Sequence, residues 1–472
     1  MKIGFVSLGC PKNLVDGEVM LGLAREAGHE ITSDASNAEA IVINTCAFID
    51  RAKEESIDAI LEMARLKRDG HCRTLVVTGC LAERYRDELK QEIPEIDVVL
   101  GTGDVPEIVE ALGGRSGGAS GVAPLRLYRS ASALVPEVAG AEPAPPAVAP
   151  GPTYLYDAST PRVLTTPRHY AYVKIAEGCD YTCAFCIIPT LRGQYRSRDI
   201  DSIVTEAERL AAGGTRELLL ISQDTTFFGI DRGERGALAR LLRRLNAIEG
   251  LTWIRLLYLY PTTITDDVLD AMAECEKVCK YVDLPLQHAS AAVLKRMRRP
   301  GNRQTYDTLL ARIRARVPGV TLRTTFIVGF PGETEADVDE LATFVAEMRF
   351  DHVGVFTYSH EEGTRAFGLD DDVPAADKQA RRDRIMRLQK QIVAKARKGQ
   401  VGTTVRVMVD GPSPESDLVV TGRLEGQAPD IDSMVVFSDC DPAMLAPGSV
   451  VDARLTAARG YDLVATPLPA SR

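Results

Sequence analysis

The sequence predicts a multidomain α/β protein with an N-terminal α/β domain, a partial (β/α)6 barrel and a small C-terminal β-barrel. The chain has 472 residues, more than one hydrophobic core organises. Strand and helix patterns alternate in two separate stretches, which is typical of parallel sheets covered by helices. After residue 400 the pattern changes to short strands alone. We therefore predict domains at 1–112, 167–399 and 400–472, with a linker at 113–166.

The N-terminal domain is predicted from short, partly β-branched apolar runs separated by helical spacing. The expected strands are 3–8, 40–44, 74–78 and 96–100, and the expected helices are 50–67 and 83–91. This alternation favours a parallel sheet. The linker that follows is rich in Gly, Ala and Pro, a composition typical of a mobile, partly extended connector.

The central domain repeats the alternation on a larger scale. Strands are expected at 170–176, 217–222, 253–260, 281–286, 322–328 and 353–358, with helices between them, for example at 200–212 and 334–348. Six strand–helix units indicate a partial barrel rather than a closed eight-fold one, and active sites on such folds gather at the carboxyl ends of the strands.

The C-terminal domain begins after a predicted connecting helix at 376–399. Short β patterns follow at 404–409, 418–421, 434–437 and 450–455, which predicts a small β-barrel. Residues 401–472 contain five Arg and no Lys against ten Asp or Glu, a formal charge of −5. Such a surface suits a basic partner better than a nucleic acid.

The bulk composition restricts the class of protein. A hydrophobic fraction of 45% and a charged fraction of 26% are ordinary for a soluble protein. The net charge of −10 argues against strong nucleic-acid binding. No apolar run approaches the roughly 18 residues of a membrane helix, and the N-terminus lacks a signal-peptide pattern, so we expect a cytoplasmic protein without membrane partners. In that reducing compartment the ten cysteines favour metal binding or chemistry over disulfides.

The strongest motif is a group of three cysteines on one short loop, which we call the loop triad. Cys179, Cys183 and Cys186 follow the first predicted strand of the barrel. Three thiolates this close suit an iron–sulfur cluster and leave one iron of a four-iron cluster open. A structural zinc site remains the alternative, although it requires a fourth Cys or His nearby.

A second group, which we call the strand-end triad, is scattered in sequence. Cys10, Cys46 and Cys80 each follow a predicted strand of the N-terminal sheet. Ligands of open parallel sheets bind beyond the carboxyl ends of strands, so the three thiols could converge on a cluster. Ordinary buried thiols are the alternative. The remaining cysteines receive no role: Cys72, Cys275, Cys279 and Cys440.

With these two triads, the sequence resembles the radical S-adenosylmethionine methylthiotransferases, and the resemblance covers nearly the whole chain. It includes a cluster-binding N-terminal domain, a radical barrel and a C-terminal TRAM-like domain. Within the family the chain is similar to the branch that modifies ribosomal protein S-twelve. The stretches that carry this similarity are 6–16, 166–172, 284–290 and 326–334. His288-Ala289-Ser290 stands where the tRNA-modifying branch has a Ser-Gly-Ser type sequence, and Ala47 replaces the more usual Gly.

The resemblance implies two [4Fe–4S] clusters and S-adenosylmethionine as cofactors. The loop triad would hold the cluster that binds S-adenosylmethionine and, after reduction by an electron donor, releases a 5′-deoxyadenosyl radical. That radical would remove hydrogen from the β-carbon of an aspartate of ribosomal protein S-twelve. The strand-end triad would hold the cluster that carries the sulfur, and a further S-adenosylmethionine would supply the methyl group. The six cysteines are thus the expected catalytic and metal-binding residues.

Candidate contacts to S-adenosylmethionine come from polar groups and glycines near the carboxyl ends of the barrel strands or after the cysteine loop. They are Ser197, Arg198, Gln223, Asp224, Gly329 and Glu333. An arginine there could pair the cosubstrate carboxylate, and glycine permits close approach to an adenosine. Strand-end turns also carry these residue types for structural reasons alone.

Two other functions compete with this hypothesis. A tRNA methylthiotransferase would use the same chemistry on a nucleic acid, which the acidic C-terminal domain disfavours. A non-catalytic iron–sulfur carrier would bind clusters without cleaving S-adenosylmethionine, and such a carrier has little use for a large barrel.

Overall fold

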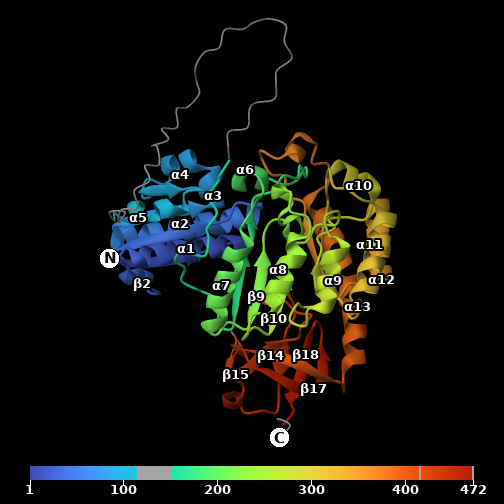
Figure 1. The fold of residues 1–472 in the computed structure, drawn as a ribbon. Coiled ribbons are helices and arrows are strands. Elements are labelled where there is room, and N and C mark those ends of the chain that lie inside the picture. Colours follow the sequence, from blue (N-terminus) through green and yellow to red (C-terminus); the bar gives the residue numbers. More distant parts are fainter. Residues whose placement is uncertain (114–150, 414–415, 470–472) are drawn as a thin grey trace, which may run out of the picture.

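The structure is a computed structural model that describes residues 1–113, 151–413 and 416–469. The linker predicted at 113–166 therefore falls largely outside the described residues. Figure 1 shows the N-terminal domain beside the barrel and the C-terminal domain beneath it. No helix in the described ranges is long and apolar enough to span a bilayer.

The N-terminal domain is a five-stranded, fully parallel sheet in the order β2-β1-β3-β4-β5. Its strands are β1 (Lys2–Ser7), β2 (Glu30–Thr32), β3 (Ala40–Thr45), β4 (Thr74–Gly79) and β5 (Val98–Leu100). Its helices are α1 (Pro11–Glu26), α2 (Asp50–Asp69), α3 (Cys80–Arg84), α4 (Arg86–Glu92) and α5 (Ile108–Ala111). The predicted helix at 83–91 is divided because Tyr85 leaves helical geometry (φ −130°, ψ 40°).

The barrel consists of two three-stranded parallel halves. The first half is β6 (Tyr170–Lys174), β9 (Glu217–Ile221) and β10 (Trp253–Leu256), and the second is β11 (Tyr281–Asp283), β12 (Thr321–Val328) and β13 (His352–Thr357). A parallel bridge between Ile254 and Val278 joins them. Among the described residues no pairing links β6 to β13, so the barrel is open, as the sequence predicts.

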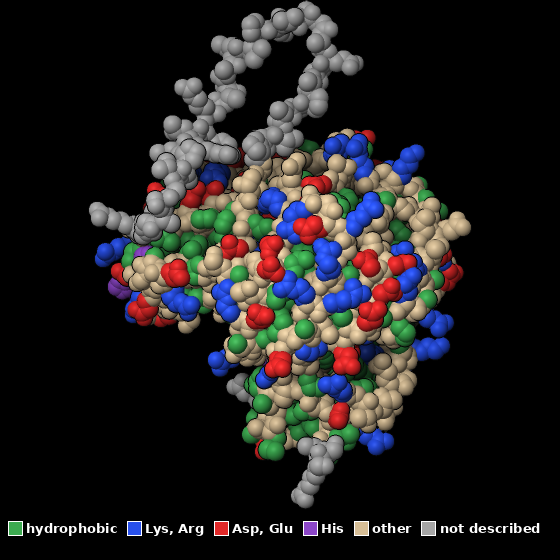
Figure 2. Space-filling view, in the orientation of Figure 1, with side chains coloured by type: hydrophobic (Ala, Val, Ile, Leu, Met, Phe, Trp, Pro, Cys, Tyr) green, Lys and Arg blue, Asp and Glu red, His purple; other side chains and the backbone are tan. Residues whose placement is uncertain are grey.

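Helices cover the outside of this barrel (Figure 1). They are α7 (Ile200–Ala212), α8 (Ala237–Asn246), α9 (Asp266–Glu274), α10 (Ala291–Arg296), α11 (Arg303–Arg316), α12 (Glu335–Met348) and α13 (Ala375–Gln400). On the visible face, charged side chains of both signs are interspersed over these helices (Figure 2). The short elements β7 (Ala176–Glu177), α6 (Ile188–Arg192) and β8 (Arg196–Ser197) surround the cysteine loop.

Residues 151–166 pass between the N-terminal domain and the barrel. The Arg162 guanidinium pairs with Glu18 of α1 at 2.5 Å and with Glu206 of α7 at 2.7 Å. Gly22 of α1 allows a very close approach, because a Cβ there would lie 2.3 Å from the Pro161 carbonyl oxygen. This part of the chain thus ties the two domains together.

The C-terminal domain is a closed barrel in the order β14-β15-β16-β18-β17. Its strands are β14 (Thr404–Ser413), β15 (Ser416–Arg423), β16 (Val435–Phe437), β17 (Val450–Arg459) and β18 (Asp462–Pro467). The small β-barrel is confirmed, with one strand more than the sequence patterns indicated.

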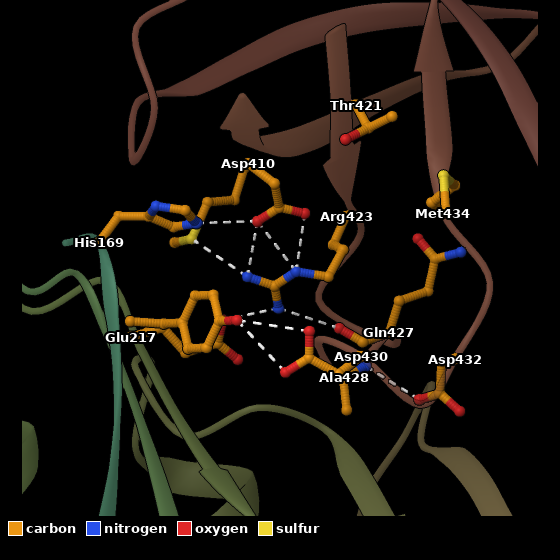
Figure 3. Close-up of polar contacts among 12 residues, drawn as sticks. His169, Glu217, Asp410, Thr421, Arg423, Gln427, Ala428, Asp430, Asp432 and Met434 are labelled. Atoms are coloured by element: carbon orange, nitrogen blue, oxygen red, sulfur yellow. Dashed lines mark hydrogen bonds and ion pairs between the residues drawn. The ribbon is translucent and has the colours of Figure 1, made fainter. Parts of the chain in front are cut away.

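A charge network joins this domain to the amino ends of the barrel strands (Figure 3). Arg423 donates to Asp410 at 2.9 Å and pairs with Glu217 of β9 at 2.6 Å. Asp430, which is exposed, accepts from the Tyr172 hydroxyl at 3.1 Å, and Asp432 accepts from the Tyr281 hydroxyl at 2.7 Å. Part of the acidic surplus of this domain is therefore engaged with the barrel, which weakens the charge argument made from the sequence.

Candidate functional site

The strand-end triad lies at the carboxyl ends of three adjacent strands. Cys10 follows β1 and precedes α1, Cys46 follows β3, and Cys80 opens α3 directly after β4. Asn13 holds two of the loops together, donating to the Leu8 carbonyl at 2.7 Å and to the Thr45 carbonyl at 3.2 Å. The sheet order β1-β3-β4 thus gathers three cysteines that lie far apart in sequence.

Glycines with positive φ precede Cys10 and Cys80 in the strand-end triad and Cys179 in the loop triad, and Gly9 and Gly178 illustrate the steric reason. Gly9 has φ 91°, and a Cβ there would lie 2.8 Å from the Cys46 Cβ. Gly178 has φ 88°, and a Cβ there would lie 2.0 Å from the Gln194 carbonyl oxygen. Because only glycine adopts this conformation without strain or clash, these residues fix the direction in which Cys10 and Cys179 leave the backbone.

Electrostatics shows that the three thiols of the strand-end triad are neighbours. Burial, together with the nearby Cys10 and Cys80, raises the pKa of Cys46 to about 12. Burial also raises the pKa of Cys80, against the opposing effect of Arg192. Thiols that discourage one another's ionisation become thiolates when a positive metal centre compensates them, so this donor set fits a cluster.

The loop triad is built by one turn of chain at the end of β7. The Cys179 amide donates to the Gly193 carbonyl at 3.1 Å, and the Cys186 amide donates to the Cys183 carbonyl at 3.2 Å. Burial, together with the neighbouring thiols, raises the pKa of Cys179 to about 11 and that of Cys186 to about 12. These thiols would also become thiolates when a positive metal centre compensates them, so this donor set fits a cluster as well.

Neither triad is arranged around a single ion. Within 1–113, 151–413 and 416–469, no three Cys, His, Asp or Glu side chains are placed to hold one metal ion. A single zinc ion holds each thiolate at about 2.3 Å, whereas a four-iron cluster is wider and separates its ligands further.

Two buried arginines, which the sequence analysis missed, each donate to a cysteine sulfur. Arg192 of α6 donates through Nη2 to the Cys80 Sγ at 3.4 Å. Arg299, just after α10, donates through Nη1 to the Cys183 Sγ at 3.8 Å and lies over the Tyr260 ring at 4.2 Å. No sequence pattern marks either residue, because each is brought to its sulfur by the packing of a separate segment.

Charged groups fill the contact between the N-terminal domain and the barrel. Lys174 of β6 pairs with Asp16 of α1 and with Glu177 of β7, the latter at 2.5 Å. Lys12 of α1 places its Nζ 3.0 Å from the centroid of the Tyr258 ring. Tyr258 adopts a left-handed conformation (φ 62°) at the end of β10, a strained geometry that is common at functional sites. The two domains therefore meet where the cysteines lie.

Two of the candidate cosubstrate contacts engage protein partners. Ser197 of β8 donates to Asp231 at 2.6 Å and accepts from the Gly229 amide at 2.8 Å. Arg198 is buried, pairs with Glu206 at 2.6 Å and donates to the Lys174 carbonyl at 2.9 Å. These contacts hold the segment after the cysteine loop against α7.

Three further candidates also act inside the protein. Asp224 is buried and accepts from the Tyr181 hydroxyl at 2.8 Å and from the Thr263 hydroxyl at 3.1 Å. Glu333 accepts from the Gly329 amide at 2.6 Å and lies 3.0 Å from His288 Nε2. These bonds shape the turns at the ends of β9 and β12.

Gln223 differs from the other candidates because one of its polar atoms is not used. Its Nε2 donates to Glu177 at 2.5 Å, while its Oε1 is buried without a hydrogen-bond partner among the described residues. The Nε of Arg299 is likewise buried and unpartnered within the part of the chain that the structure describes. Buried polar atoms without partners are costly, so both positions are suited to a polar ligand.

Comparison with known proteins assigns a family description to each domain. Residues 2–101 match the uncharacterized protein family UPF0004, residues 173–345 match the radical SAM superfamily, and residues 401–468 match the TRAM domain.

Three relatives that match over nearly their full length share the name "Ribosomal protein uS12 methylthiotransferase RimO". The protein from Koribacter versatilis is 49% identical, with 98% of this chain and 96% of the relative covered. The proteins from Solibacter usitatus (47% identical, 99% and 94% covered) and Myxococcus xanthus (46% identical, 98% and 90% covered) have the same name.

A solved structure shares the fold at low sequence identity. The radical S-adenosylmethionine methyltransferase TsrM from Kitasatospora setae, solved with cobalamin and a [4Fe–4S] cluster, has a TM-score of 0.52 and 18% identity. The match covers 75% of this chain and 72% of TsrM. This likeness supports the barrel architecture alone.

Proposed function

The chain belongs to the RimO family of ribosomal protein uS12 methylthiotransferases, and on this basis we propose that it adds a methylthio group to the β-carbon of an aspartate of uS12. One observation carries the proposal. The strand-end triad lies at the carboxyl ends of three parallel strands, the loop triad follows β7, and Arg192, six residues after Cys186, reaches the Cys80 Sγ across the contact between the two domains. That arrangement suits a reaction in which a radical is generated at one site and sulfur is supplied at the other.

Each triad offers three thiols for a [4Fe–4S] cluster, which leaves one iron without a protein ligand. The loop triad would hold the cluster that binds S-adenosylmethionine, and the strand-end triad would hold the second cluster. When bound, these groups would supply one-electron cleavage of the sulfonium and a sulfur atom for transfer, while the protein orients them and excludes competing reactions.

Side chains of the barrel position the cosubstrate. The Gln223 Oε1, which has no partner among the described residues, would accept from its amino group, and the Arg299 guanidinium would pair with its carboxylate. Asp224 and Arg198 act indirectly: Asp224 holds Tyr181 of the cysteine loop, and Arg198 fixes the segment after this loop. Ser197, Gly329 and Glu333 keep the neighbouring turns in shape.

The substrate approaches from the side of the cysteines. The opposite mouth of the barrel is closed by a loop of the TRAM domain, in which Gln427 and Ala428 are fully buried. Ribosomal protein uS12, free or in the small subunit, is the proposed macromolecular partner, and a cytoplasmic location follows from it. An external reductant supplies the electron for cleavage of the cosubstrate.

The test offers two substrates in parallel to anaerobically reconstituted protein with S-adenosylmethionine and a reductant. We expect mass spectrometry to find a methylthio gain on an aspartate of uS12 and none on total tRNA. Modification of tRNA alone would overturn the substrate assignment. Cluster binding without release of 5′-deoxyadenosine would instead indicate an iron–sulfur carrier.

A further inference from the structure

Arg192 lies in the segment that follows the loop triad and contacts the strand-end triad through its guanidinium group. It ends α6, six residues after Cys186 in sequence, yet it donates to the Cys80 Sγ of the N-terminal domain at 3.4 Å. The same Nη2 donates to the Asn13 Oδ1 at 3.2 Å. The side chain is only 2% exposed, so the contact is shielded from water.

The other side of this guanidinium is held by carboxylates. Its Nη1 donates to Asp16 at 2.5 Å and lies 3.2 Å from Glu177. Lys174 pairs with the same two carboxylates, so Arg192 shares them with a second cation. A guanidinium stays protonated in proteins, so Arg192 keeps its positive charge. A permanently charged donor therefore faces the Cys80 sulfur.

We propose that Arg192 is a positioning residue that sets the reduction potential of the cluster held by the strand-end triad. This inference rests on the proposed function, because it requires that cluster. A cationic donor on a thiolate stabilises the state of the cluster with the extra electron, so it raises the reduction potential. Since α6 follows the cysteine loop directly, Arg192 also holds Cys80 in register with the loop triad.

The experiment isolates the strand-end cluster in the full chain by replacing Cys179, Cys183 and Cys186 with Ala. Redox titration, followed by visible absorbance and electron paramagnetic resonance, then measures its potential. In the Arg192→Gln variant we expect the ratio of reduced to oxidised cluster at a fixed potential to fall about tenfold, equivalent to 59 mV for one electron. Arg192→Lys keeps the charge and should recover part of this shift.

Arg162→Gln is the matched control. Arg162 is a buried arginine that links the same helix, α1, to the barrel through Glu18 and Glu206. None of its described hydrogen bonds reaches a sulfur. Its loss should lower thermal stability without moving the cluster potential.

The possible results separate this inference from the function on which it rests. An unchanged potential in a fully loaded Arg192→Gln protein would overturn the role of Arg192 and leave the methylthiotransferase assignment intact. If Arg192→Gln retains too little iron to measure, the neutral Arg192→Met variant takes its place, and an unchanged potential in that variant would overturn the role equally. Failure of the parent chain to bind iron would overturn the second cluster itself.

Discussion

The two triads reach the same donor set by opposite routes. Three cysteines of the loop triad lie within eight consecutive residues, so one turn of backbone places them. The strand-end triad spans Cys10 to Cys80, and the order of three parallel strands places it. Each has one guanidinium on a sulfur, at 3.4 Å for Cys80 and 3.8 Å for Cys183. Local sequence can thus specify one site of this chemistry, while the other depends on the whole sheet.

Cysteine replacement should separate the two triads most strongly. We expect Cys183→Ala to abolish release of 5′-deoxyadenosine, whereas Cys46→Ala should keep this release and lose methylthio transfer. Each variant should lose about four of about eight irons per chain, since a four-iron cluster depends on its thiolates. Iron analysis and chromatography of the products test this, with the buried Cys275→Ala as control. Loss of 5′-deoxyadenosine in Cys46→Ala would show that the triads do not act separately.

Glycine replacement should disturb each triad through its backbone. Gly9→Ala should weaken the strand-end cluster and Gly178→Ala the loop cluster, because each adds a Cβ into occupied space at positive φ. Gly28 has φ 86°, and a Cβ added there would meet nothing within 4 Å. Gly28→Ala therefore tests backbone strain alone, which costs about 1–2 kcal/mol. Thermal unfolding and iron retention distinguish them. Equal iron loss in all three variants would contradict a local effect on the triads.

Replacement of Arg299 should affect the cosubstrate and leave the strand-end cluster unchanged. Because a hydrogen bond to a charged group contributes about 1.5–3 kcal/mol, Arg299→Gln should weaken S-adenosylmethionine binding about 10- to 100-fold. Equilibrium dialysis measures this. Arg296→Gln is the control, since Arg296 donates to the carbonyls of Pro331 and Gly332 instead. Unchanged binding in Arg299→Gln would remove Arg299 from the cosubstrate site.

The smallest effect is expected far from both triads, where the TRAM domain joins the barrel. Burial acts to raise the pKa of Asp410, but the bond with His169 and the Arg423 guanidinium lower it below its usual value. The stabilisation is therefore present above about pH 4 and is lost as pH falls through the lowered pKa. Asp410→Asn should lower the melting temperature at pH 7 by a few degrees and reduce the difference between pH 7 and pH 3. An equal pH response in both proteins would contradict this assignment.

The sequence predicted more of the fold than of the cosubstrate site. The six strand patterns predicted between residues 170 and 358 form the open barrel. Each is a largely apolar run, and such a run is buried when the chain folds. The helix α1 was not predicted, although Pro11 at its first position is a helix-start signal. Polar residues at strand ends were harder to interpret, since the same Asp, Ser and Gly serve turns and ligands. Arg198 and Glu333 illustrate this, because both are held by protein partners.

The sequence by itself determined the fold class, the spacing of Cys179, Cys183 and Cys186, and the family resemblance, because these depend on neighbours along the chain. Only the tertiary structure decided that Arg192 contacts Cys80 and that Arg299 contacts Cys183. It also decided that the Gln223 Oε1 has no hydrogen-bond partner among the described residues, whereas Asp224 accepts from the Tyr181 hydroxyl. The physical reason is that a buried polar atom takes its role from the partners packed around it. For Arg192 and Arg299 the cysteine partner lies more than 100 residues away in the sequence.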